Sequence, residues 1–412
     1  MKTSVLGTPL NKGESLVIAG AGISGLFAGF FLKKAGYTFK IVEKNSRVGG
    51  LLNTHKLECG LAEGAANGFI YTSLFNELLE TLNIQPVPSN KEKSKKYFLI
   101  NSNLSTYPLT FSETLRVVKG LISPTGSTGR SVYDFMSVKL GKGFVDKLVS
   151  PALGGIYGTG AEELYLPLVF PALEQADPDQ KVVKTLMGLK PKEKNKGTYS
   201  FTNGMGELPM ALHQFLREET FLNQALTDLK TPTLLTVPAF ATALLFEGHK
   251  IGSLLQGISY SPILSCTVFF KRQQLKRYKE GFGCLVPKTE GYSTMGVLFN
   301  DCIFPGRSVD TVSLTAIVRN KEWATLSEEE ASEKVLKEIK AIFEIEGEPQ
   351  EYKLFQYPKG IPVYNRYLYE SLKEVDILLK KDFPHVRLFG NYTGQISIRG
   401  LCESASHWVN PL

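Results

Sequence analysis

The chain has 412 residues, of which 43% are hydrophobic and 21% are charged. This composition is sufficient for a sizeable core and excludes an intrinsically disordered protein, and the length indicates two or three domains. Lysine and arginine number 47 against 40 for aspartate and glutamate, so the net charge is +7. Such a mild excess fits an anionic substrate or an acidic membrane surface and does not indicate nucleic-acid binding.

The five cysteines and five histidines lie singly along the chain. Without a Cys-x-x-Cys pair or a cysteine–histidine cluster, we expect neither a disulfide framework nor a metal site, which is typical of a reducing compartment. The first 15 residues contain no continuous apolar stretch of the kind found in a secretory signal. We therefore expect a cytoplasmic protein.

Two uncharged stretches, residues 15–32 and 251–270, approach the length of a membrane span. Four glycines interrupt the first stretch, and Gly257 and Pro262 interrupt the second. We therefore expect neither stretch to cross a membrane. The second is predicted to be a loop followed by a buried strand.

The segment 16–48 predicts a strand–helix–strand unit of the dinucleotide-binding type. A short apolar run is followed by Gly20-Ala21-Gly22-Ile23-Ser24-Gly25 and then by a helical pattern. In such a unit the first glycine permits a tight turn, the second lets the backbone approach a pyrophosphate, and the third allows close helix packing. Glu43 is placed to accept hydrogen bonds from a ribose. The predicted elements are a strand at 16–19, a helix at 26–35 and a strand at 39–43.

After Glu43 the chain departs from the pattern of nicotinamide dehydrogenases. The segment Glu43-Lys44-Asn45-Ser46-Arg47-Val48-Gly49-Gly50 resembles the FAD-binding segment of the flavin amine oxidase superfamily. Residues 59–65 resemble, more loosely, the loop beside the flavin ring, and residues 386–405 resemble the closing strand and helix start. The resemblance implies that Arg47 meets the pyrophosphate. Because both ends of the chain would form one site, the FAD domain is predicted to be discontinuous.

Internal segments narrow the resemblance to one family. The chain is similar, over nearly its whole length and in the same order, to the FAD-dependent protoporphyrinogen and coproporphyrinogen oxidases of heme biosynthesis. The matching segments are residues 133–135, 141–147, 151–158, 164–171, 281–287, 295–299, 304–307, 360–362, 390–392 and 402–403. The resemblance implies removal of six electrons from a porphyrinogen, with hydrides passing to non-covalently bound FAD and then to molecular oxygen or another acceptor. Whether protoporphyrinogen IX or coproporphyrinogen III is the substrate stays open.

The resemblance also implies the residues of the site. Phe282 and Leu285 would sandwich the macrocycle, Gly155 would let the backbone approach it, and Lys96 would neutralise a propionate. The family usually has arginine at the position of Lys96, and lysine cannot form the bidentate pair. The alternatives are core packing for Phe282 and Leu285, a turn for Gly155 and a solvated charge for Lys96. The implied FAD-binding residues are Gly20, Gly22, Ile23, Ser24, Gly25, Glu43, Lys44, Arg47, Gly49, Gly50, Glu63, Gly64, Gly390, Asn391, Ile396 and Ile398.

We predict an α/β fold with α+β insertions: a discontinuous FAD-binding Rossmann-like domain, a mixed-sheet substrate domain and a helical insertion. The predicted boundaries are 1–86, 201–262 and 376–412 for the FAD domain, 87–200 for the helical insertion and 263–375 for the β-rich substrate domain. Lysines between residues 181 and 196 accompany an apolar helical pattern. This region is suited to the anionic inner face of a cell membrane, and an exposed lysine-rich linker is the alternative. A homodimer is compatible with the sequence.

Three features depart from the family pattern. Only residues 218–233 remain where the family has a three-stranded meander beside the adenine half of FAD, which leaves room for one strand at 220–222. Tyr357 replaces a tryptophan, and residues 364–366 replace a stretch that carries a Gly-His pair. These departures keep two other hypotheses open: a flavin oxidase that acts on amines or polyenes, and a non-catalytic protein that binds a tetrapyrrole or FAD.

Overall fold

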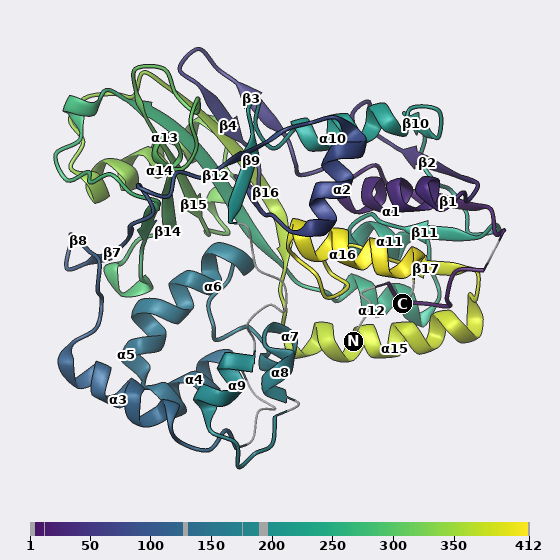
Figure 1. The fold of residues 1–412 in the computed structure, drawn as a ribbon, viewed down its shortest axis with the longest axis horizontal. Coiled ribbons are helices and arrows are strands. Elements are labelled where there is room, and N and C mark those ends of the chain that lie inside the picture. The colour runs from purple at the N-terminus through teal and green to yellow at the C-terminus, as the bar shows by residue number, and fades with distance from the viewer. Residues whose placement is uncertain (1–4, 12, 127–130, 175, 189–196, 411–412) are drawn as a thin grey trace.

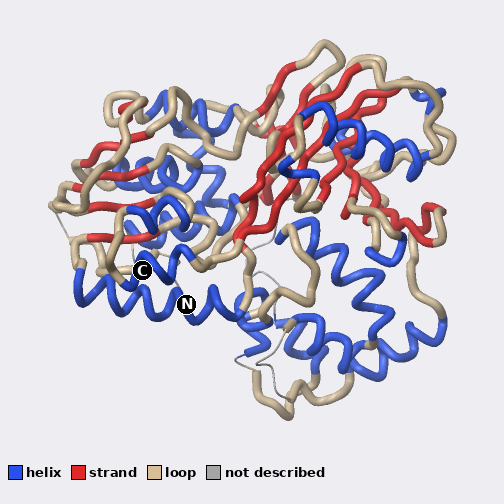
Figure 2. The backbone as a smooth tube through the Cα atoms, turned by 180° about the vertical axis from the view of Figure 1, so that it is seen from behind, coloured by secondary structure: helices blue, strands red, loops and turns tan. Residues whose placement is uncertain are grey.

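The structure, a computed structural model, describes residues 5–11, 13–126, 131–174, 176–188 and 197–410. Within these ranges the chain forms a parallel sheet covered by helices, a larger mixed sheet, and a helical unit packed beside both (Figure 1). The described segments nearest the two ends both lie beside the parallel sheet (Figure 2), since Leu6 bonds to Leu388 and Val409 packs in the same core as Ile18. The predicted fold class is confirmed.

The parallel sheet has five strands in the order β10-β2-β1-β11-β17, and every neighbouring pair is parallel. Its strands are short apolar runs, as expected for a sheet that is buried on both faces. Their bounds are β1 Leu16–Ala19, β2 Phe39–Glu43, β10 Thr220–Leu222, β11 Thr233–Leu235 and β17 Val386–Leu388. Strands β2 and β10 lie where the sequence predicted them.

Helices cover both faces of this sheet because successive strand residues point to opposite sides. Ile18 and Ile41 pack in a cluster with α1, α2, α10 and α16, whereas Val17 and Val42 pack in a cluster with α11, α12 and α15. The bounds on the first side are α1 Ile23–Lys34, α2 Ser73–Leu82, α10 Glu207–Phe215 and α16 Ile398–Val409. Those on the second side are α11 Ala239–Leu244, α12 Lys250–Gln256 and α15 Arg366–Asp382.

The mixed sheet has seven strands in the order β16-β12-β15-β14-β13-β7-β8. They are β7 Lys96–Ile100, β8 Asn103–Ser105, β12 Tyr260–Phe270, β13 Gly283–Leu285, β14 Thr294–Phe299, β15 Val312–Val318 and β16 Glu351–Pro362. Helices α13 Asn300–Ile303 and α14 Glu328–Phe343 pack on one face of it. Two small sheets complete the strands: β3 Thr54–Lys56 with β4 Leu61–Glu63, and β5 Phe69–Ile70 with β9 Thr198–Phe201 and β6 Pro86–Pro88.

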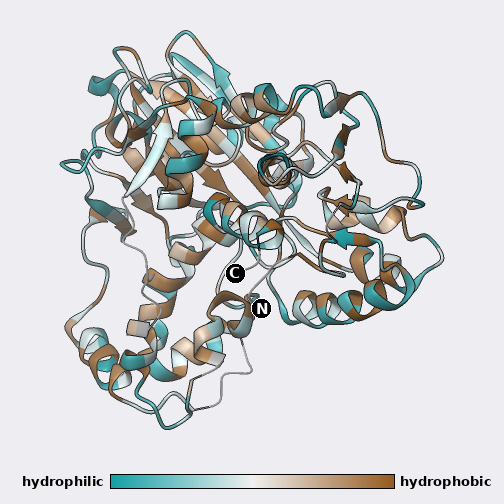
Figure 3. Cartoon of the chain, turned by 45° about the vertical axis from the view of Figure 1, so that its right-hand side comes forward, coloured by the Kyte–Doolittle hydropathy of each residue, from teal (hydrophilic) through white to brown (hydrophobic). Residues whose placement is uncertain are grey.

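The helical unit comprises α3 to α9, and its apolar residues run along the helices at the lower left of Figure 3. Its bounds are α3 Phe111–Leu121, α4 Val132–Leu140, α5 Lys142–Phe144, a π-helical turn at Val145–Val149, α6 Ser150–Tyr157, α7 Leu166–Val169, α8 Pro171–Glu174 and α9 Val182–Gly188. No helix in the described ranges combines the length and the hydropathy needed to cross a bilayer.

Three details differ from the sequence-based prediction. Residues 250–256 form helix α12 and not a loop, because the apolar side chains Ile251 and Leu255, spaced one helical turn apart, are buried. Strands β7 and β8, placed within the predicted helical insertion, pair into the mixed sheet next to β13. Most of α15 falls within the predicted substrate domain. In the structure it packs against the parallel sheet, on the same face as α11 and α12. The remaining boundaries stay a prediction.

A buried ion pair joins strand β4 to the segment that enters the mixed sheet. Arg307, which precedes β15, donates from Nη1 to Oε1 of Glu63 at the end of β4, with N and O 3.1 Å apart. The two side chains are each 4% exposed. Arg307 also donates to Ser200 Oγ and to the Phe201 carbonyl, and Glu63 also accepts from the Met205 amide at 2.8 Å. Segments from three parts of the chain therefore meet at one charge pair.

Replacing Arg307 by Met is expected to destabilise the protein strongly. Removing one partner leaves a buried, uncompensated carboxylate, which typically costs about 3–5 kcal/mol of unfolding free energy. Urea denaturation measures the change. Arg366→Met is the matched control, because Arg366 pairs with Glu370 on the surface and its loss should change stability little. Equal unfolding free energies for the two variants would contradict the role of the buried pair.

Candidate cofactor cavity and substrate face

The parallel strands bring their carboxyl ends to one edge of the sheet, where ligands of such folds bind. Gly20 follows β1, Glu43 ends β2, Thr236 follows β11 and Gly390 lies two residues after β17. A cavity of about 460 Å³ opens at this edge. Of the predicted FAD-binding residues, its lining includes Gly20, Gly22, Glu43, Lys44 and Gly50.

The glycine motif has the geometry that a phosphate cradle requires. Gly20 adopts φ +106°, a conformation that favours glycine, and a Cβ on Gly25 would lie 2.0 Å from the Gly20 carbonyl oxygen. Gly22 is the N-cap of α1, no side chain caps it, and a Cβ there would meet nothing within 4 Å. The first turn of α1, which includes Ile23 and Ser24, therefore presents uncapped backbone amides at the cavity, an arrangement that attracts an anion.

Glu43 is fixed by three hydrogen bonds. Its Oε2 accepts from the Ala21 amide at 2.9 Å, and its Oε1 accepts from the backbone and side-chain nitrogens of Asn45 at 2.9 and 2.7 Å. The carboxylate is nearly buried, yet it lines the cavity. Because an ionised carboxylate has about four acceptor positions, Glu43 retains capacity for a ribose hydroxyl.

The Gly49–Gly50 turn crosses the glycine motif. Gly49 donates its amide to the Ala21 carbonyl at 2.8 Å, and both glycines have positive φ, +95° and +58°. The guanidinium of Arg47 donates to the Val48 and Gly50 carbonyls, so it braces this turn. Arg47 is exposed and is not among the residues that line the cavity. Its predicted contact with a pyrophosphate stays a prediction.

The shortened segment after β10 closes the adenosine side of the cavity. Gln224 donates its amide to the Glu43 carbonyl at 2.8 Å, and Asn223 donates to the Asn45 carbonyl at 3.1 Å. Gln224 and Leu226 line the cavity. A few residues tied to the end of β2 therefore form part of the cavity wall.

The structure gives Glu63 a structural role that the sequence did not predict. Its carboxylate, predicted to lie beside a flavin, is occupied by Arg307, Met205 and Thr54 in the junction between the sheets. Burial raises the pKa of Glu63. Gly64, the next residue, is tightly enclosed, because a Cβ there would lie 2.8 Å from the Tyr357 hydroxyl. Glu63 thus anchors these segments, and its predicted contact with the cofactor stays a prediction.

The C-terminal segment lies at the same sheet edge. The Phe389 amide donates to the Leu235 carbonyl at 2.9 Å, and the Gly390 amide donates to Thr393 Oγ1 at 3.2 Å. Ile396 is half-buried, and Ile398 begins α16, whose N-terminus is capped by Ser397. Helix α16 packs against α1. The two ends of the chain therefore contribute to one structural unit, as predicted.

Strand pairing places Lys96 and Leu285 on one face of the mixed sheet. Strands β7 and β13 are parallel, with Gly283 opposite Lys96 and Leu285 opposite Phe98. On the other face of these strands, Tyr97 and Cys284 are buried in the core. Phe282 precedes β13, and the ammonium of Lys96 lies 5.5 Å from the centre of its ring. Phe282 and Leu285 are half-buried, so neither is a core residue.

Two further apolar residues share this face, which we call the substrate face. Phe98 lies opposite Leu285, and Leu298 on β14 lies opposite Gly283. Both are half-buried, and Gly283 and Gly296 between them carry no side chain that would cover the face. Strands β7 and β14 are nearly continuous apolar runs, so the sequence does not tell their two faces apart, and their pairing with β13 is visible only in the fold.

A second cavity lies beside α6. It has a volume of about 370 Å³, and its lining includes Gly154, Val286, Lys288, Met295 and Arg319. Gly154 packs near the Met295 sulfur, and the exposed Gly155 follows it on α6. None of Lys96, Gly155, Phe282 and Leu285 lines this cavity, although Gly154 and Val286, which adjoin Gly155 and Leu285 in sequence, do. Among the described residues, no group of three or more His, Cys, Asp or Glu side chains is placed to hold a metal ion.

Comparisons with known proteins agree with this arrangement. Residues 18–81 match the NAD(P)-binding Rossmann-like domain. Protoporphyrinogen oxidase 2 of Arabidopsis thaliana is 25% identical over 94% of this chain and 91% of its own length. Coproporphyrinogen III oxidase of Bacillus subtilis is 20% identical over 92% and 93%. A solved structure from Exiguobacterium sp. 255-15, named as a candidate protoporphyrinogen oxidase, is 20% identical, covers 97% of this chain and 98% of its own, and superposes with a TM-score of 0.80.

These matches confirm the predicted resemblance to porphyrinogen oxidases over nearly the whole chain. The predicted enzyme class, an oxidoreductase, agrees with the names of these relatives. The predicted cofactor, FAD, agrees with the match to a dinucleotide-binding domain. The glycine cradle, the carboxylate of Glu43 and the uncapped start of α1 fit an adenine dinucleotide.

Replacing Gly22 by Val is expected to abolish FAD binding while the fold survives. The new side chain would enter the open space of the cradle, where a Cβ meets no protein atom. Absorbance of the purified variant gives the FAD content per chain. Gly155→Val is the matched control: its Cβ also meets open space, but on α6. That variant should retain FAD. Normal FAD content in Gly22→Val would show that the motif has been misassigned.

Proposed function

We propose that this protein is an FAD-dependent porphyrinogen oxidase that converts protoporphyrinogen IX or coproporphyrinogen III to the porphyrin. The observation that carries the proposal is the pairing of two sites in one chain: a dinucleotide cavity at the edge of the parallel sheet and an apolar substrate face on the mixed sheet. The full-length similarity to porphyrinogen oxidases supports the same reaction.

The cofactor would supply the redox chemistry, and the protein would bind and orient the cofactor and the substrate. Bound FAD would accept a hydride in each of three two-electron oxidations and would return the electrons to oxygen, as peroxide, or to another acceptor. Gly20, Gly22 and Glu43 would hold its adenosine and pyrophosphate. The remaining task of the chain is to hold a flexible macrocycle and to exclude water.

The substrate face is suited to a flat, apolar macrocycle with anionic edges. Phe98, Leu285 and Leu298 come from three adjacent strands that together span about 10 Å. Lys96 lies at the margin of this face and is exposed, and it forms no ion pair within the described ranges. Its ammonium is thus available to a propionate, whose negative charge it would neutralise as a point charge.

The competing hypotheses predict different reactivity. A flavin oxidase of amines or polyenes would consume oxygen with those substrates, and a non-catalytic binder would consume none. Oxygen uptake by the FAD-loaded protein, measured with protoporphyrinogen, coproporphyrinogen and a panel of amines, separates them. Uptake with amines alone, or no uptake with any substrate, would contradict the proposal.

Truncating Phe282 to Ala is expected to lower kcat/KM for the porphyrinogen by about tenfold to a hundredfold, because an aromatic contact of this kind contributes roughly 1–3 kcal/mol. The FAD content and Tm should change little, since the ring is half-buried. Phe221→Ala, which truncates an exposed phenylalanine on β10, is the control and should leave all three quantities unchanged. Lost stability with normal turnover in Phe282→Ala would remove Phe282 from the site.

We further propose that the protein contacts an anionic membrane surface through α3. Phe111, Leu115, Val118 and Ile122 follow one side of this helix and are 81%, 47%, 53% and 60% exposed. Arg116 and Lys119 lie on the adjacent side, which is the arrangement of an interfacial helix. We call these four apolar residues the α3 stripe. Their exposed apolar surface is about a few hundred Å², which is less than the roughly 800 Å² that each partner buries in a stable dimer.

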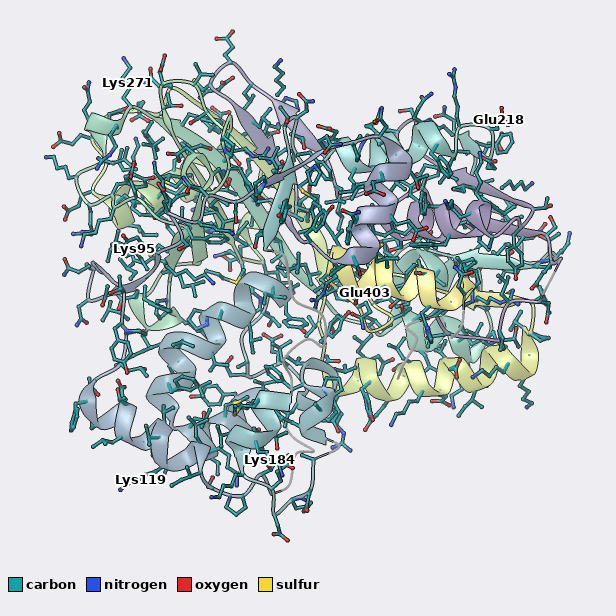
Figure 4. The ribbon with its side chains drawn as sticks, in the orientation of Figure 1. Lys95, Lys119, Lys184, Glu218, Lys271 and Glu403 are labelled. Atoms are coloured by element: carbon teal, nitrogen blue, oxygen red, sulfur yellow. The ribbon has the colours of Figure 1, made fainter. Side chains whose placement is uncertain are left out.

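The location differs from the sequence-based prediction. Helix α9, which carries Lys184, packs against α3, and both Lys119 and Lys184 lie at the outer end of the helical unit (Figure 4). Lys190, Lys192, Lys194 and Lys196, which were part of the predicted membrane region, lie outside the described residues. The exposed apolar residues that favour a membrane are therefore concentrated on α3.

Replacing Phe111 and Leu115 together by Ser is expected to reduce binding to anionic vesicles at least about tenfold, because each buried side chain contributes roughly 1.5–3 kcal/mol. Flotation with vesicles of phosphatidylcholine and phosphatidylglycerol measures binding, and pure phosphatidylcholine tests the charge dependence. The control replaces Val309 and Ile377, which are equally exposed elsewhere, by Ser. A wild-type protein that fails to float, or a control that binds as weakly as the α3 variant, would contradict the proposal.

A further inference from the structure

Tyr364 occupies a junction between three distant parts of the chain. It lies between the end of β16 and the start of α15 and is 1% exposed. Its hydroxyl donates to the backbone carbonyl of Asn391, in the segment that follows β17. Its own carbonyl accepts from the Tyr165 amide at 2.8 Å, in the loop that precedes α7.

The ring of Tyr364 also contacts the helix beside the second cavity. Tyr157, the last residue of α6, packs edge-on against it, with ring centres 5.2 Å apart and planes at 61°. Gly155 lies two residues earlier on the same helix. One side chain thus touches α6 with its ring and the Gly390–Asn391 turn with its hydroxyl.

The hydroxyl of Tyr364 is suited to a permanent donor role. Burial raises the pKa of Tyr364 well above its ordinary value, so the phenol keeps its proton at physiological pH. The Gly390–Asn391 turn has a further tie at Gly390, whose amide donates to Thr393 Oγ1. The Asn391 carbonyl itself is held by Tyr364, and losing a buried donor typically leaves such a carbonyl unsatisfied at a measurable cost.

We propose that Tyr364 is a positioning residue that fixes the Gly390–Asn391 turn relative to α6, so that FAD affinity depends on a side chain outside the cofactor cavity. The inference rests on the proposed function, because it assumes that this turn contacts the bound flavin. This role rests on the contacts of Tyr364 in this chain.

The test is the variant Tyr364→Phe, which keeps the ring and its packing and removes only the hydroxyl. The dissociation constant for FAD, from titration of the deflavinated protein, is expected to rise about fivefold to twentyfold. The visible circular dichroism of the bound flavin should change as well, because its surroundings shift. Tm should fall by only a few degrees.

Tyr97→Phe is the matched control. Tyr97 is also buried, and its hydroxyl also donates to a backbone carbonyl, that of Glu280, at 2.9 Å, but it lies in the mixed sheet. The Tyr97→Phe variant should show a fall in Tm similar to that of Tyr364→Phe, with unchanged FAD affinity and an unchanged flavin spectrum. This separates a positioning role from a merely structural one.

The outcomes distinguish the two proposals. A wild-type protein that binds no FAD contradicts the proposed function and this inference with it. A wild-type protein that binds FAD, together with a Tyr364→Phe variant of equal affinity and spectrum, contradicts the inference alone. Equal losses of affinity in the Tyr364→Phe and Tyr97→Phe variants would also overturn it.

Discussion

The buried pair of Glu63 and Arg307 is the constraint that ties β4 and β9 to the segment entering β15 of the mixed sheet. The parallel and mixed sheets have separate hydrophobic cores. The charge pair fixes the segments around it at one point, because a buried guanidinium and carboxylate tolerate little displacement. The segment that leads from Gly49 to β4 is thereby held between the cofactor cavity and the mixed sheet.

The cofactor cavity follows from the geometry of parallel strands. Strands β1, β2 and β11 end at one edge, so the glycine motif, Glu43 and the residues after Leu235 converge there although they are far apart in sequence. Thr236 reinforces the convergence, because its hydroxyl donates to the Ala19 carbonyl at 2.8 Å. The uncapped start of α1 then provides partial positive charge where no protein side chain competes for it.

The substrate face is the part of the mixed sheet that no large side chain covers, beside Gly283 and Gly296. Glycines at 283 and 296 expose a patch whose apolar side chains come from β7, β13 and β14, and α6 packs against the adjoining part of β14. Tyr157 and Tyr364 continue from α6 to the C-terminal turn at the cofactor edge. A short chain of contacts thus connects the two halves of the proposed active site.

The sequence by itself determined the elements whose signals are local. The glycine motif, strands β2 and β10 and the terminal Glu43 lie as predicted, since turn chemistry and short apolar runs act over a few residues. It also indicated the family, because the motifs occur in the same order along the chain. The helix α12 was missed because its short apolar pattern is interrupted by glycine and serine, and only burial reveals its periodicity.

Only the tertiary structure decided which distant residues meet. It showed that β7 and β8 belong to the mixed sheet, that Phe98 and Leu298 share a face with Leu285, and that Arg307 pairs with Glu63. It also showed that Tyr364 reaches Asn391. Contacts of this kind depend on strand register and on the packing of segments separated by many residues, and no local pattern in the chain encodes them.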